Sequence, residues 1–221
     1  MSIMKLVGFD GQIERQVARG DVFALAEVMP AAVTTAANLT ITGAMLAAGL
    51  ILRNPGGVSN ENLDTAANIV LALSQGLGTT GIEPGTSFRC RWVNQAAFAL
   101  TLVATANTGI TLTGTATVIA SGAKDVLVQI QNGTPAKTTL ANTTTSGSAV
   151  VGGFSDAEIA AVSPGMIVLN AVANLQGQTI LGVSLAAKTV TMSGNANATS
   201  TVSIQFSPLI NFYAIGCTTA L

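Results

Sequence analysis

Few charged side chains in this sequence could form a binding or catalytic group. The densest group in the strand-rich central region is Glu83, Arg89 and Arg91, and its two arginines could bind an acidic ligand. We favour the plainer interpretation, in which these charges lie on the solvated face of a strand. Glu61 and Asp64 could form a carboxylate pair, but acidic residues are also favoured beside the N-terminus of a helix. We therefore expect both to flank a helix that begins at Asp64.

The absence of histidine from the sequence removes the commonest general base and the commonest metal ligand. Ser-His-Asp and Cys-His relays and histidine-containing zinc sites are therefore excluded. No glycine-rich phosphate loop and no acidic calcium loop occurs either. We predict a protein that is not an enzyme, with no catalytic, cofactor-binding or metal-binding residues and no small-molecule substrate.

The remaining reactive or aromatic residues are isolated. Cys90 and Cys217 could form one disulfide, but two reduced, buried thiols are the simpler interpretation. Trp92 is expected in the core, and with Tyr213 it makes a weak platform for a sugar. Four Asn-x-Ser/Thr sequons are attributed to chance in so threonine-rich a chain, at Asn38, Asn132, Asn142 and Asn197.

The overall composition is unusually poor in charge. The 221 residues include 9 Lys and Arg and 10 Asp and Glu, so only 9% are charged, against about 25% in typical soluble domains. This balance argues against binding to nucleic acid. The longest apolar run, 39–52, is too short to span a membrane, and we predict no membrane contact. A mean hydropathy of +0.57 then indicates apolar surface that another protein covers.

Most elements that would position these residues are predicted to be strands. Phe88, Cys90 and Trp92 alternate with polar residues, as a strand with one buried face requires. Asn132-Gly133 is the strongest predicted hairpin turn. Helices are predicted over 64–73, ending at Gly76 or Gly78 with a buried stripe that includes Leu77, and after a capping box at Ser155 and Glu158.

We therefore expect an all-β protein: an antiparallel β-sandwich or barrel plus a second small β domain, with two or three short helices. The predicted divisions are an N-terminal arm (1–29), a β-sandwich domain (30–135), a small β domain (136–208) and a C-terminal strand (209–221). The arm either orders against a partner or is a poorly ordered terminus. The last strand either extends the small domain or returns to the first.

Two groups of segments resemble β-rich structural proteins of tailed bacteriophage virions. One group contains ILRNPGG (51–57), DTAA (64–67), GTSFRCRWVN (85–94) and NTGITLTG (107–114). The other resembles a small β module of phage head and tail proteins, in SGSAVVG (146–152), PGMIV (164–168), TVTMS (189–193) and NANAT (195–199). The resemblance covers about residues 50–208 and implies no catalytic residues.

This resemblance implies a capsid cement or decoration protein of a tailed phage. We expect it on the capsid surface of the virion, made in the host cytoplasm, where it binds the major capsid protein and itself as a homotrimer. A tail, fibre or baseplate component with a host-recognition role is the alternative. An adhesin-like sugar-binding module and a carboxylate-dependent hydrolase are weaker hypotheses.

Overall fold

The computed structural model describes residues 3–7, 14–18, 33–34 and 38–218. They belong to two compact units, Met1–Ala31 and Ala32–Leu221. In the first unit, β1 (Ile3–Val7) pairs antiparallel with β2 (Glu14–Ala18). The other residues of the predicted arm, 1–29, lie outside the described residues.

The second unit is mostly β, as predicted, and none of its described sheets closes into a barrel. Two sheets build what we call the main lobe, residues 33–132 and 209–218. One sheet has the strand order β4-β6-β10-β17-β8 and the other has the order β3-β5-β7-β9. The strands are β3 (Leu39–Ile41), β4 (Leu50–Arg53), β5 (Ser59–Leu63), β6 (Ser87–Asn94), β7 (Leu100–Ala104), β8 (Ile110–Thr113), β9 (Thr117–Val118), β10 (Gly122–Asn132) and β17 (Leu209–Thr218).

From β3 to β10, successive strands alternate between these two sheets. β3, β5, β7 and β9 lie in the four-stranded sheet, and the intervening strands lie in the five-stranded one. Four pairs are parallel, namely β3–β5, β5–β7, β4–β6 and β8–β17. The expected antiparallel arrangement is wrong for these pairs. The reason is that apolar alternation reports which face of a strand is buried, not which strand lies beside it.

Two helices lie on the connections that return to the five-stranded sheet. α2 (Gly43–Ala47) follows β3 and α3 (Ala66–Leu77) follows β5. They pack closely, because a Cβ at Gly43 would lie 2.8 Å from the Cβ of Ala72. Both sheets and both helices contribute to one core, which includes Leu46, Ile69, Val70, Trp92, Leu100, Leu102, Val126, Val128 and Phe212.

Residues 137–207 form a second group of strands, which we call the small lobe. Its two sheets have the orders β11-β16-β13 and β12-β15-β14. It has its own core, in which the Phe154 and Phe206 rings lie 6.2 Å apart between centroids. The elements are β11 (Lys137–Thr144), β12 (Val150–Val151), α4 (Asp156–Ile159), β13 (Ile167–Val168), β14 (Ile180–Ser184), β15 (Thr189–Met192) and β16 (Ser200–Ser207).

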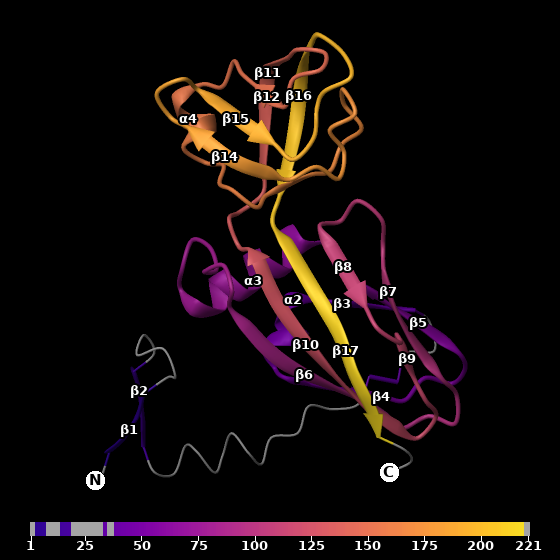
Figure 1. The fold of residues 1–221 in the computed structure, drawn as a ribbon. Helices are drawn as coiled ribbons and strands as arrows, with labels where there is room; N and C mark the ends of the chain where they lie inside the picture. Colours follow the sequence, from indigo (N-terminus) through magenta and orange to yellow (C-terminus); the bar gives the residue numbers. More distant parts are fainter. Residues whose placement is uncertain (1–2, 8–13, 19–32, 35–37, 219–221) are drawn as a thin grey trace. The chain divides into compact units, whose positions relative to one another are not determined.

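The C-terminal strand returns to the main lobe, which decides between the two places that the sequence left open. β17 pairs antiparallel with β10 and parallel with β8. Asn132 and Leu209, at the ends of β10 and β17, are Cα partners. The small lobe is therefore an insertion between two adjacent antiparallel strands (Figure 1).

The predicted hairpin at Asn132-Gly133 is wrong, because β10 and β11 belong to different sheets. The Asn132 amide instead donates to the Ser163 hydroxyl at 2.9 Å and to the Pro164 carbonyl at 2.8 Å. A Cβ at Gly133 would lie 2.0 Å from the Ile82 carbonyl oxygen. Glycine is needed here for close backbone approach rather than for a turn.

The local helix signals are mostly confirmed. Ser155 and Glu158 form the predicted capping box of α4. α3 ends at Gly78 with φ +69°, but its N-cap is Thr65 rather than Asp64. Leu77, expected in the buried stripe of this helix, is 55% exposed.

Candidate interaction surface

The charged residues that stand out in the sequence do not form a common site. Glu83 is exposed in the turn before β6, and Arg89 and Arg91 occupy exposed positions of that strand. Arg91 lies 3.7 Å from the carboxylate of Asp125 on β10, and both side chains are nearly half exposed. Within the described residues, no ion pair joins Glu83 to either arginine. The two arginines are solvated strand charges, as expected, whereas Glu83 is an exposed charge outside the strand.

Glu61 lies in a different environment from the one expected for it. It lies fully buried on β5 and accepts from the guanidinium of Arg53, from Nε at 3.0 Å and from Nη2 at 2.9 Å. Arg53 lies on β4, so this two-point ion pair joins the two sheets of the main lobe. The prediction that Glu61 flanks the helix is wrong. Asp64 does lie there, where its carboxylate accepts from the Thr65 backbone N–H and the Asn68 amide.

The isolated reactive residues are mostly buried. Cys90 is a free, buried thiol, as predicted, and burial together with the charge of Asp125 raises its pKa to about 12. The side chain of Cys217 lies outside the described residues. Trp92 is fully buried in the core, so it offers no stacking surface for a sugar.

Neither a metal centre nor a membrane-spanning helix emerges from the residues that the structure describes. No group of three or more metal-ligating side chains is present among them. None of their helices combines the length and the apolar character needed to cross a bilayer.

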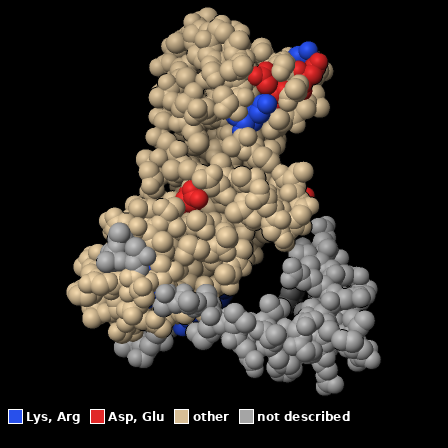
Figure 2. Space-filling model, turned by 180° about the vertical axis from the view of Figure 1, so that it is seen from behind, with Lys and Arg blue, Asp and Glu red and all other residues tan. Residues whose placement is uncertain are grey.

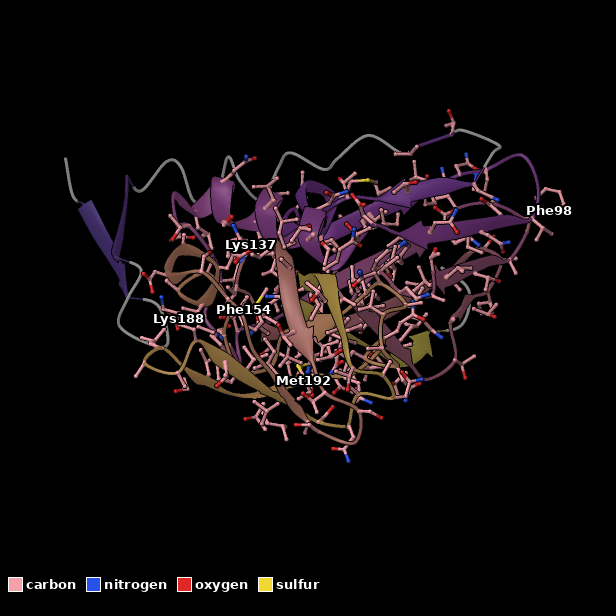
Figure 3. All side chains as sticks on the ribbon, turned by 90° about the horizontal axis from the view of Figure 1, so that it is seen from above. Phe98, Lys137, Phe154, Lys188 and Met192 are labelled. Carbon is pink, nitrogen blue, oxygen red and sulfur yellow. The ribbon has the colours of Figure 1, made fainter. Side chains whose placement is uncertain are left out.

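Three large apolar side chains lie at one end of the four-stranded sheet, where β5 and β7 begin and β9 ends. Val58, Phe98 and Ile119 are 75%, 43% and 39% exposed. Strand register brings their turns together, because Leu100 pairs with both Ser59 and Val118. We call the turns 54–58, 95–99 and 119–121 the apolar tip. Figure 3 shows Phe98 projecting from its turn at an extremity of the main lobe.

Asn94, buried at the end of β6, holds two of these turns together. Its side-chain amide donates to the carbonyl of Phe98 at 2.6 Å and to that of Ile119 at 2.9 Å. Its carbonyl oxygen accepts from the backbone N–H of Ala96 at 3.0 Å. A single buried side chain therefore fixes the backbone beneath two exposed apolar residues.

Arg53 fixes the neighbouring part of the tip. It occupies the register position beside Asn94, and its backbone carbonyl accepts from the Gln95 N–H at 2.8 Å. Its Nη1 donates to the carbonyl of Val33 at 2.6 Å, which ties the segment before β3 to the edge of β4. The tip is thus built on buried polar contacts.

Sequence reasoning missed the tip because its three apolar residues lie far apart in the chain. A usable signal does exist. Each turn places one large apolar residue among Gly, Ala, Pro, Asn, Gln or Ser, without any charge: NPGGV, QAAFA and IAS. Only the strand pairing shows that these turns are neighbours.

Other large apolar side chains of the described residues are also exposed, namely Leu71, Leu77, Leu140, Val150, Leu181, Leu185 and Ile215. Val150, Leu181 and Leu185 are exposed on or beside β12 and β14 of the small lobe. The same lobe holds a surface ion pair between Lys188 and Asp156 at 3.0 Å. Figure 2 shows charged side chains gathered mainly over the small lobe on the visible face, most of which is uncharged.

Comparisons of the chain with protein-family models, curated proteins and solved structures find no match.

Proposed function

We propose that this chain is a non-enzymatic structural protein of a virion: a cement protein that binds the assembled head of a tailed bacteriophage. Its partner would be the major capsid protein. The observation that carries the proposal is the pairing of a nearly uncharged, strand-built framework with exposed apolar side chains on both lobes. Apolar surface of this kind is expected where another protein covers it.

The resemblance of residues 50–208 to phage virion proteins supports the same proposal. We interpret the two sheets of the main lobe as a β-sandwich, since both contribute to one core. A rigid framework suits a cement protein, because little conformational entropy is lost when a preorganised surface binds. Low charge also limits repulsion between neighbouring copies.

The test is the copy number of this chain in purified particles, measured by quantitative mass spectrometry against the major capsid protein. A cement protein that follows the shell lattice gives a ratio near a simple fraction of the shell subunits. A far smaller ratio would assign the chain to the tail or baseplate. Absence from the particles would overturn any role as a virion component.

A further inference from the structure

We propose that Asn132-Gly133 is a modification site, where spontaneous deamidation occurs when the contact between the two lobes opens and yields a product that keeps the contact open. This reaction is independent of the proposed function. Asn132-Gly133 is the only Asn-Gly pair in the chain. Such a pair is chemically prone to deamidation, because glycine has no side chain to shield the backbone nitrogen that attacks.

Deamidation has two steps, and both need freedom of movement and access to water. In the first, the backbone nitrogen of Gly133 attacks the side-chain carbonyl carbon of Asn132. A C–N bond forms, and the side-chain amide nitrogen leaves as ammonia with the proton that the Gly133 nitrogen loses. In the second, one water molecule opens the resulting succinimide ring by breaking one of its two C–N bonds. The product is aspartate, or isoaspartate if the main-chain bond breaks.

The small lobe holds the amide that has to leave. The Asn132 side chain lies at the end of β10 and is buried, with 1% of the residue exposed. Its amide nitrogen donates to the Ser163 hydroxyl at 2.9 Å and to the Pro164 carbonyl at 2.8 Å. Both acceptors belong to the segment between α4 and β13 of the small lobe. We call these two hydrogen bonds the lobe clamp.

The attacking side of the pair is held as well. The Asn132 carbonyl oxygen accepts from the Thr134 backbone N–H at 2.9 Å, and the Thr134 hydroxyl lies 2.6 Å from that of Ser163. Gly133 is buried, and its carbonyl accepts from the Ile82 N–H at 3.1 Å. Ring closure moves both the side chain and the backbone in a closely packed environment. The closed lobe clamp therefore opposes the reaction.

The product cannot rebuild the lobe clamp. An ionised carboxylate only accepts hydrogen bonds, so Asp at position 132 would place an acceptor against the Pro164 carbonyl oxygen. Burying the new charge there is costly as well. Isoaspartate also adds a methylene to the main chain where Asn132 pairs with Leu209. Opening of the clamp followed by deamidation is therefore irreversible.

The first experiment follows deamidation of the full-length chain by mass spectrometry of peptide 125–137, in which Asn132 is the only asparagine. The unmodified chain, Ser163→Ala and the control Ser203→Ala are incubated in the same buffer. The unmodified chain is also incubated unfolded in urea. The Ser203 hydroxyl donates to the Thr139 carbonyl within the small lobe, so the control removes a comparable hydrogen bond that does not involve Asn132.

Ser163→Ala should deamidate roughly threefold to tenfold faster than the unmodified chain, because losing one hydrogen bond shifts the opening equilibrium by about this factor. Ser203→Ala should stay within about twofold of the unmodified chain. The urea-unfolded chain should react at least about tenfold faster than the folded one. Equal rates in the folded and unfolded chains, or equal rates in the two variants, would overturn the proposal.

The second experiment tests the product with Asn132→Asp. Trypsin cleaves after Lys137, directly beyond the linker 133–136, only when this part of the chain opens. Cleavage there should be roughly tenfold faster in Asn132→Asp, which loses both bonds of the lobe clamp. Asn197→Asp makes the same charge change at an exposed position and should leave the cleavage rate unchanged. An unchanged rate in Asn132→Asp would show that the product does not keep the lobes apart.

Discussion

At the scale of single residues, the buried pair Arg53–Glu61 gives the sharpest prediction for stability. Both side chains are fully buried and lie 2.9 Å apart. Glu61→Gln removes the negative charge of this buried pair, and breaking a buried ion pair from one side typically lowers the free energy of unfolding by about 3–5 kcal/mol. Urea unfolding followed by the fluorescence of Trp92, the only tryptophan, measures the change.

Lys188→Gln is the matched control, because it breaks an ion pair whose two side chains are 47% and 86% exposed. Surface pairs of this kind contribute about 0–1 kcal/mol. Equal effects of the two substitutions would contradict the prediction that breaking the buried pair lowers the free energy of unfolding more than breaking an exposed one.

Cys90 gives a prediction for alkaline pH. Burial and the Asp125 charge raise the pKa of its thiol from 9.0 to about 12. Below pH 9 both folded and unfolded chains hold the proton, whereas between pH 9 and 12 only the folded chain does, so stability falls as pH rises. By pH 10.5 the loss attributable to Cys90 is about 2 kcal/mol. Unfolding curves at pH 8 and pH 10.5 should show this loss in the unmodified chain and not in Cys90→Ala.

At the scale of elements, two helical glycines should respond in opposite ways to alanine. Gly43 of α2 faces α3 so closely that a Cβ would lie 2.8 Å from both the Cβ of Ala72 and the carbonyl oxygen of Ile69. Gly43→Ala should therefore destabilise the main lobe by about 1–3 kcal/mol. A Cβ at Gly76 in α3 meets nothing within 4 Å. Gly76→Ala should stabilise by about 0.5–1 kcal/mol, through helix propensity. Thermal unfolding distinguishes the signs, and a stabilising Gly43→Ala would contradict this packing of α2 on α3.

Elements whose signals are local could be predicted from the sequence. The Ser155–Glu158 capping box and the alternation of Phe88, Cys90 and Trp92 each depend on neighbours within a few residues. The choice of which strands pair does not depend on such close neighbours. The parallel pairs and the Arg53–Glu61 contact between sheets arise from the alternating path of the chain, which periodicity does not encode. Asn132-Gly133 failed as a hairpin because tertiary contacts with Ser163 and Ile82 use both residues.

The exposed surface was the part least accessible to sequence reasoning. High hydropathy indicated that apolar surface is present, without indicating where. Phe98 and Ile119 are 21 residues apart in the chain, yet their carbonyls accept from the same Asn94 amide. Their proximity results from the pairing of β7 with β9. Locating the candidate surface therefore required the strand register.

At the scale of the whole molecule, the main lobe has a strand pairing and a core of its own. β10 and β17 pair along most of their length, from Ala123–Thr218 to Asn132–Leu209, and the small lobe leaves from one end of this pair. The core residues of the two lobes form separate clusters. The main lobe therefore has the sheet pairing and the core that it needs without the small lobe.

Replacing residues 136–207 with a two-residue glycine-rich turn should consequently leave the main lobe folded. β10 and β17 then form a hairpin, and the main loss is the hydrogen bonding of Asn132 to Ser163 and Pro164. The shortened chain should still unfold cooperatively in urea, with Trp92 reporting on its core. If this chain also binds phage particles, the attachment surface of the proposed cement protein lies on the main lobe. A shortened chain that folds but no longer binds would place the attachment surface on the small lobe, and one that does not fold would show that the main lobe needs its insertion.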